Sequence, residues 1–144
     1  MEDDVINKIR AFNRFYTEVI GVTNNHILES NYSLTEVRTM YEIYHNPGIT
    51  AREIKEILKM DEGYLSHLIA KLVKKNIIKR TQTKGDNRIF SLALTQTGEN
   101  TFLKLNQLSS DAVAKTIQHL TKSEQIELIQ SLDKIKKLIT KSKT

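Results

Sequence analysis

Apolar residues recur at intervals of three and four along most of this chain, and this periodicity predicts a largely helical protein. One stripe predicts a long helix from residue 3 to about residue 29, and it consists of Val5, Ile9, Phe12, Tyr16 and Val19. A second stripe predicts a last helix over residues 122–141, and it consists of Leu128, Leu132, Ile135 and Ile139. Both stripes have heptad-like spacing, so we expect these helices to pack on a partner chain as well as on their own domain.

Polar motifs predict where the other helices begin. In a capping box, a hydroxyl side chain accepts a hydrogen bond from an amide of the first turn, and a glutamate three residues later reaches back to the amide of the cap. The three boxes are Ser33-Leu34-Thr35-Glu36, Thr50-Ala51-Arg52-Glu53 and Thr121-Lys122-Ser123-Glu124. Together with the caps Asp61 and Thr95, they predict helices over residues 34–44, 51–58, 61–75, 96–120 and 122–141.

Two β-rich segments follow the helix that ends near residue 75, and the turn sequence between them predicts a hairpin. The segments are residues 77–83 and 88–94, joined by Lys84-Gly85-Asp86-Asn87. Asn76 stands where a helix often ends in a left-handed residue, a position at which asparagine is the second choice after glycine. Three helices followed by a two-stranded hairpin have the plan of a winged helix-turn-helix.

We therefore expect a mainly α protein with a small β-hairpin wing, in the α+β class. A winged helix-turn-helix lobe occupies residues 33–94, and the helices of residues 1–30 and 96–144 form a dimerisation region. The whole of residues 1–144 is predicted to be one unit, as its length allows.

Positive charge is concentrated in the predicted helix and hairpin. The formal net charge of the chain is +5, whereas residues 71–88 contain seven basic residues and one acid and so carry +6, which leaves −1 for the remainder. Such a local concentration favours a surface that meets phosphates. The basic residues are Lys71, Lys74, Lys75, Lys79, Arg80, Lys84 and Arg88.

The helix over residues 61–75 has one apolar and one polar face. We expect the buried face to consist of Leu65, Leu68, Ile69, Leu72 and Val73, and the exposed face of Gly63, Ser66, His67, Ala70, Lys71 and Lys74. A helix that enters a major groove needs small and polar residues there, because bulky apolar side chains cannot pair with base edges.

Each exposed residue has a predicted task at such a groove. Ser66 and His67 suit base edges, Lys71 and Lys74 suit phosphates, and Gly63 allows the start of the helix to approach the backbone. Tyr64, at the border, has a hydroxyl within reach of a phosphate. The alternative for any one of these residues is an ordinary solvated surface, but the set lies beside a basic hairpin and favours nucleic acid.

The hairpin supplies the other predicted contacts. Arg88 is the candidate for insertion into the narrow, negative minor groove. Asp86, two residues earlier, is placed to pair with Arg88 and fix its direction, although aspartate is also a common turn residue. Arg80 and Lys84 would add phosphate contacts.

No constellation for catalysis or metal binding emerges from the sequence. The four histidines are dispersed and the five glycines are scattered, so neither a metal motif nor a phosphate loop can be assembled. His26 and His119 fall near predicted helix ends, where the helix dipole favours a histidine, and we prefer this interpretation to a regulatory metal shared across a dimer. We expect no enzyme, no cofactor and no bound metal.

Composition also indicates the cellular location of the protein. The chain has no cysteine, no apolar run near the ~18 residues of a membrane span, and a Met-Glu-Asp-Asp start unlike a signal peptide. These features predict a soluble, cytoplasmic protein.

The stretch from Gly63 to Phe102 resembles the MarR family of bacterial transcription regulators, and the flanking helices extend the resemblance to nearly the whole chain. The matching features are Leu65-Ser66, Leu72 through Lys75 with Ile77-Ile78 and Arg80, Asp86-x-Arg88, and Leu94-Thr95-x-x-Gly98. Two residues depart from the family pattern: Asn76 replaces the usual glycine, and His67 stands where the related Gly-Tyr-Leu-Ser branch usually has arginine.

The resemblance implies a homodimer that binds an inverted repeat of double-stranded DNA and represses transcription until a small-molecule effector relieves it. It assigns Asp86 and Arg88 to the wing and Ser66, His67 and Lys71 to the helix that faces DNA. It also implies an effector pocket between the first helix, the second helix and the lobe. Candidate lining residues are Phe12, Phe15, Tyr16, Tyr41 and Tyr44, for which core packing is the preferred interpretation.

Sequence-specific regulation of transcription is therefore the predicted function. The alternative is a winged-helix module whose basic face binds an acidic protein partner. Ser66, His67 and Arg88 separate the two, because only groove reading demands a preference for particular DNA sequences.

Overall fold

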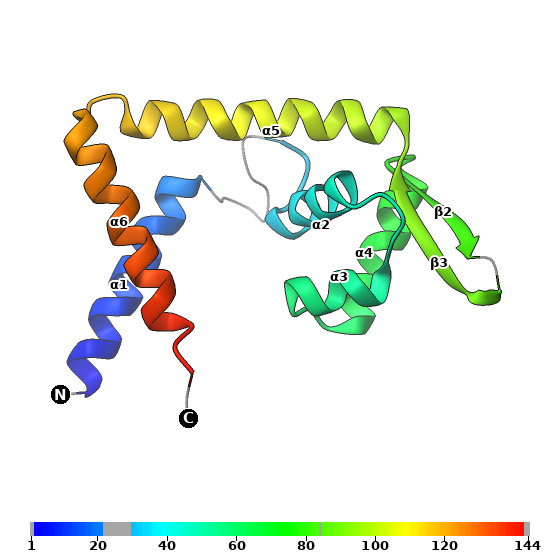
Figure 1. The fold of residues 1–144 in the computed structure, drawn as a ribbon, viewed down its shortest axis with the longest axis horizontal. Helices are drawn as coiled ribbons and strands as arrows, with labels where there is room; N and C mark the ends of the chain where they lie inside the picture. Colours follow the sequence, from blue (N-terminus) through cyan, green and yellow to red (C-terminus); the bar gives the residue numbers. More distant parts are fainter. Residues whose placement is uncertain (1, 22–29, 84, 143–144) are drawn as a thin grey trace. The chain divides into compact units, whose positions relative to one another are not determined.

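A computed structural model describes residues 2–21, 30–83 and 85–142 of the 144-residue chain, apart from the side chains of Asp86 and Asn87. The chain forms two compact units, residues 1–109 and residues 110–144. The elements are α1 (Glu2–Ile20), α2 (Leu34–His45), β1 (Ile49–Thr50), α3 (Ala51–Leu58), α4 (Glu62–Lys74), β2 (Ile78–Thr83), β3 (Asp86–Leu94), α5 (Gln96–Ile117) and α6 (Lys122–Ile139). This order confirms the predicted fold class, a mainly helical protein with a small winged sheet (Figure 1).

All three predicted capping boxes are present. In each box the hydroxyl accepts from the backbone amide of the glutamate and the carboxylate accepts from the backbone amide of the cap, at the starts of α2, α3 and α6. The other two caps are also confirmed: Asp61 accepts from the Tyr64 amide at 3.0 Å, and Thr95 Oγ1 accepts from the Gly98 amide at 2.9 Å.

The predicted extent of the first helix is wrong at its carboxyl end. The helix ends at Ile20 and not near residue 29, because Gly21 adopts φ +80°, where a helix cannot continue, and donates its amide to the Thr17 and Glu18 carbonyls. The expected helix-end position of His26 lies outside the described residues. Asn76 has φ +60°, which confirms the left-handed position predicted after α4.

The wing belongs to a sheet of three strands and not only to the predicted two-stranded hairpin. The strand order is β1-β3-β2 and both pairings are antiparallel, with Ile49 opposite Leu92 and Arg80 also opposite Leu92. The Gly48 amide donates to the Leu92 carbonyl at 2.9 Å and brings the turn after α2 onto β3. A strand of two residues has too few positions to show a period, which is why the sequence did not predict it.

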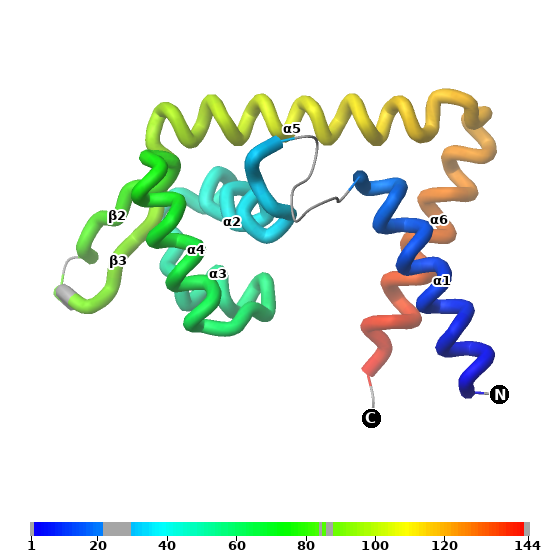
Figure 2. Tube along the Cα trace, turned by 180° about the vertical axis from the view of Figure 1, so that it is seen from behind, coloured from blue at the N-terminus to red at the C-terminus, as the bar shows by residue number. Residues whose placement is uncertain are grey.

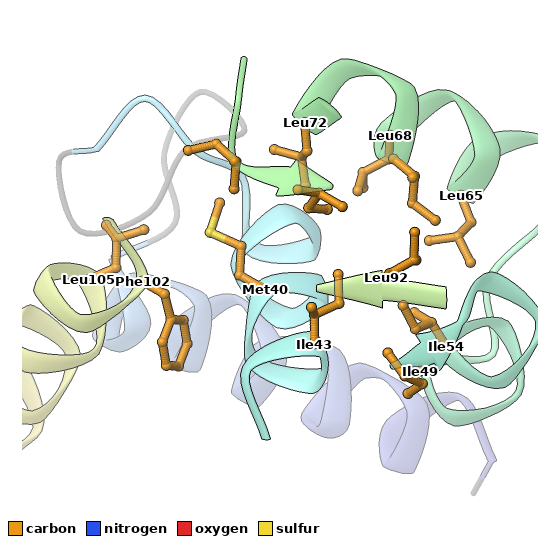
Figure 3. Close-up of a cluster of buried hydrophobic side chains, with 13 residues drawn as sticks. Met40, Ile43, Ile49, Ile54, Leu65, Leu68, Leu72, Leu92, Phe102 and Leu105 are labelled. Carbon is orange, nitrogen blue, oxygen red and sulfur yellow. The ribbon is translucent and has the colours of Figure 1, made fainter. Parts of the chain in front are cut away.

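The core of the lobe is formed by the helices around this sheet. Figure 3 shows Leu65, Leu68 and Leu72 of α4 projecting toward α2 and β3. The hydrophobic side chains that are buried in the core are Met40, Ile43, Ile49, Ile54, Leu65, Leu68, Ile69, Leu72, Ile77, Ile78, Leu92, Phe102 and Leu105. Two of them, Phe102 and Leu105, come from α5, so the amino-terminal part of that helix completes the lobe.

No helix within the described ranges combines the length and the apolar composition that crossing a bilayer requires.

Gly98, in the first turn of α5, lies against the backbone that enters the wing. A Cβ atom at this position would be 2.0 Å from the Ile77 carbonyl oxygen. That oxygen accepts from the Thr95 amide at 3.0 Å and cannot retreat without losing this bond. The start of α5 and the start of β2 therefore touch through a position that has no side chain.

We expect Gly98→Ala to lower the free energy of unfolding by about 1–3 kcal/mol, because the added methyl overpacks a backbone contact. Thr97→Ala, at an exposed position of the same turn, is the matched control and should change it by less than about 0.5 kcal/mol. Urea unfolding followed by circular dichroism measures both. Equal stabilities for the two variants would contradict the close approach.

The capping box of α6 predicts a pH dependence. The hydrogen bond from the Thr121 backbone, and then that from its side chain, lower the pKa of Glu124 below its usual value, and His119 lowers it further. Because the pKa is lower in the folded protein, this cap stabilises α6 above the usual pKa, and the stabilisation is lost as the pH falls through the lowered value. We expect Thr121→Ala to raise the pKa of Glu124 in an NMR titration, whereas Ser123→Ala leaves it in place.

Candidate nucleic-acid interface

One face of α4 is fixed in the core, and this determines which residues face solvent. Leu65, Leu68, Ile69 and Leu72 are buried and Val73 is half-buried, as the sequence predicted. The opposite face is exposed at every predicted position, which comprises Gly63, Tyr64, Ser66, His67, Ala70, Lys71 and Lys74. The face is therefore accessible, and its contact with DNA stays a prediction.

A cleft of about 650 Å³ lies between α3, α4 and the strands of the wing. It brings together three of the predicted site residues, Ser66 of α4, Arg80 of β2 and Arg88 of β3. Both views show the hairpin of β2 and β3 projecting beyond the helices (Figure 1), and Figure 2 shows this from behind. Ser66 of α4 and the two arginines of the wing thus border one concave surface, whereas His67, Lys71 and Lys74 are not among the residues that line it.

The cleft also contains charged residues that the sequence analysis missed. Arg52 and Lys55 of α3 line it, together with the acids Glu56 and Glu62. Lys55 Nζ lies 3.9 Å from Glu62 Oε2, so part of this charge is balanced within the lobe. The amphipathic pattern of α3 was a usable signal, because an inward-facing Ile54 leaves Arg52 and Lys55 on other faces of that helix.

Two residues assigned to phosphates already have partners inside the lobe. The Tyr64 hydroxyl lies 3.2 Å from Thr35 Oγ1, and Lys71 Nζ lies 3.5 Å from Glu36 Oε2. Both partners belong to the first turn of α2. The sequence could not show this, because the two turns are separated by about 30 positions and meet only when the lobe folds.

The wing contains an irregularity near Arg88. Gln82 is opposite Phe90 whereas Thr83 is opposite Asp86, so the register shifts between adjacent residues of β2. The strand β3 begins at Asp86, two residues before the predicted start. Arg88 is exposed, and Lys84 and the Asp86 side chain lie outside the described parts, so the predicted pairing of Asp86 with Arg88 stays a prediction.

The aromatic residues considered for an effector pocket fall into two groups. Phe12, Phe15 and Tyr16 of α1 are exposed, and Phe12 contacts the other two rings. Tyr41 and Tyr44 of α2 instead contact Phe102, whose ring is buried, and Tyr44 packs against the core. Core packing is thus confirmed for Tyr44, whereas the α1 aromatics are not buried.

No group of three or more histidine, cysteine, aspartate or glutamate side chains arranged to hold a metal occurs within residues 2–21, 30–83 and 85–142.

Known proteins resemble this chain in sequence. The sequence model of the MarR family matches residues 32–90. The HTH-type transcriptional regulator BilQ of Clostridium symbiosum is 34% identical over 93 residues, which are 62% of this chain and 65% of BilQ. The HTH-type transcriptional regulator SarZ of Staphylococcus epidermidis is 24% identical over 135 residues, which are 92% of this chain and 89% of SarZ. The chain therefore matches less than two thirds of BilQ but most of SarZ.

Solved structures share the fold over most of the chain. FabT of Streptococcus pneumoniae, crystallised in complex with DNA, has a TM-score of 0.76 and 17% identity, covering 96% of this chain and 97% of FabT. The apo form of MarR from E. coli has a TM-score of 0.72 and 23% identity, covering 88% and 94%. At these identities the likeness establishes a shared winged-helix fold.

The cap of α4 gives a prediction for the candidate interface. We expect Asp61→Ala to lower the free energy of unfolding by about 0.5–2 kcal/mol, because the Tyr64 amide loses its acceptor at the helix start. Glu56→Ala, which removes an exposed carboxylate from α3, should have a much smaller effect. Thermal unfolding of the two variants beside the parent protein measures the difference, and equal losses would mean that charge and not capping is responsible.

Proposed function

We propose that this chain, which resembles the MarR family over residues 32–90, is a MarR-type sequence-specific DNA-binding regulator of transcription, a repressor that acts as a homodimer. The observation that carries the proposal is the exposure of the polar face of α4, whose Ser66 borders one cleft together with the wing arginines Arg80 and Arg88. Two relatives are named as transcriptional regulators, and the structurally similar FabT was crystallised with DNA.

In the proposed complex each α4 enters a major groove and each wing reaches the flanking minor groove. Ser66 and His67 face base edges, and Gly63 and Tyr64 lie at the start of the helix near the backbone. Lys74, Arg80 and Lys84 contact phosphates. Arg88 enters the minor groove, directed by Asp86.

Unburied apolar side chains support the homodimer. Neither α1 nor α6 has a buried residue, yet both carry large apolar side chains, among them Phe15, with 59% of its surface exposed, and Ile129, also at 59%. Exposure of many such residues on two helices marks surfaces that another chain covers. We propose that residues 1–30 and 96–144 pair two copies, so that two lobes of residues 33–94 bind an inverted repeat with half-sites about one helical turn apart.

Relief of repression by a small molecule is the remaining part of the proposal. Its support is the resemblance of residues 32–90 to the MarR family. A ligand screen on the protein–DNA complex tests it.

Selection of bound duplexes from a random pool tests the central proposal. Enrichment of an inverted repeat is expected. A pool that stays random after several rounds would favour the alternative, in which the basic face docks an acidic protein.

We expect Arg88→Ala to weaken binding to the selected duplex by about 1–3 kcal/mol while the dimer persists, because a minor-groove contact is lost and the pairing helices are untouched. Fluorescence anisotropy measures affinity and analytical ultracentrifugation measures assembly. Lys122→Ala, which removes an exposed positive charge at the start of α6, is the control and should leave affinity unchanged. Unchanged affinity for Arg88→Ala would contradict the role of the wing.

A further inference from the structure

Two side chains of α4 and the side chain of its C-cap residue, Lys75, contact the segment of residues 32–36, which leads into α2 and forms its first turn. The pairs are Tyr64 with Thr35, Lys71 with Glu36, and Lys75 with Tyr32, whose ring centroid lies 5.1 Å from Lys75 Nζ. Residues 64, 71 and 75 are separated by seven and four positions, so they form one stripe along the helix and its cap. The first turn of α2 therefore lies along the edge of the proposed DNA-binding face.

The contact of Lys71 with Glu36 differs from the others because it involves a buried charge. Only 6% of the Glu36 side chain is exposed, against 54% of the Lys71 side chain. Glu36 Oε1 accepts from the Ser33 amide at 2.9 Å and completes the capping box of α2. Glu36 Oε2 is also buried and has no hydrogen-bond partner, and Lys71 Nζ, at 3.5 Å, is the cation that faces it in the described part of the chain.

A buried carboxylate is costly unless a positive charge compensates it, and removing one partner leaves the other charge uncompensated. If the Lys71 ammonium moved to a DNA phosphate, Glu36 Oε2 would lose its counter-charge while still enclosed by the lobe. A phosphate contact by Lys71 would thus lower the stability of the lobe. Lys74, one turn away and exposed, forms no ion pair within the described residues, so its charge does not compensate a buried acid.

We propose that Lys71 is a positioning residue for DNA binding and not a phosphate contact. Its ammonium neutralises the buried Glu36 carboxylate and holds α4 against the first turn of α2, so its charge is already used within the lobe. This inference rests on the proposed function, since it concerns how a DNA-binding helix is oriented. It revises the role that the sequence suggested for Lys71, because the basic face then has one phosphate-binding charge fewer than its lysines suggest.

The dependence of affinity on salt distinguishes the two roles. Log K falls linearly with log salt concentration, and each phosphate contact on duplex DNA adds about 0.9 to the absolute value of this slope, through counterion release. Anisotropy titrations with a mixed-sequence duplex at several salt concentrations measure this slope without requiring the operator. The proteins compared are the parent chain and the variants Lys71→Gln, Lys74→Gln, Glu36→Gln and Glu36→Gln/Lys71→Gln.

We expect Lys74→Gln to lower the absolute slope by about 0.9 and Lys71→Gln to leave it unchanged. In Glu36→Gln the amide oxygen can still accept from Ser33, but Lys71 is released, so the absolute slope should rise by up to about 0.9 and return to the parent value in the double variant. Glu124→Gln, the same substitution in the exposed capping box of α6, controls for net charge and should not move the slope.

Urea unfolding of the same variants tests the pair without DNA. Lys71→Gln should lower the unfolding midpoint more in the parent background than in the Glu36→Gln background, because only the former leaves an unpaired buried carboxylate. The double variant keeps the test decisive if Lys71→Gln alone fails to fold.

An absolute slope that falls by about 0.9 in Lys71→Gln would overturn the inference and leave the proposed function intact. The same fall in the double variant, with Glu36→Gln equal to the parent, would also overturn it. Equal midpoint shifts in the two backgrounds would likewise overturn it. If no variant and no parent protein binds duplex DNA in a salt-dependent manner, the proposed function fails, and the positioning role with it.

Discussion

The burial of one face of α4 is the constraint on which the rest of the lobe depends. Leu72 is completely buried, and with Leu65 and Leu68 it fixes the rotation of the helix about its own axis. A turn of the helix by even one position would bring Ser66 or His67 into an apolar core, where an unpaired polar group is costly. The orientation of the exposed face therefore follows from hydrophobic packing and not from the polar residues on that face.

Local chemistry made much of the fold predictable. Capping boxes, the left-handed Asn76 and the apolar stripe of α4 involve residues within one or two turns of each other, so their consequences are visible in the sequence. Helix ends were less certain where one glycine decides the outcome, as Gly21 does for α1. The strand β1 was not predictable, because its two residues form a strand only when Leu92 is brought beside Ile49.

The candidate site shows the same division between local and distant effects. Sequence periodicity identified correctly which residues of α4 are exposed, because exposure depends on the helix itself. It could not identify the partners of those residues, since Thr35 and Glu36 approach Tyr64 and Lys71 through tertiary packing. Exposure and availability are thus different properties, and a basic residue on a polar face can already be neutralised.

The contact between Gly98 and the Ile77 carbonyl oxygen has a mechanical meaning. Ile77 directly precedes β2, and the absent side chain at Gly98 lets the first turn of α5 lie against it without a gap. Two backbones in such contact cannot slide past each other independently. Any displacement of the first turn of α5 must therefore act on the start of β2. It must also act on the carboxyl end of α4, because the Ile77 amide donates to the Leu72 carbonyl at 2.9 Å.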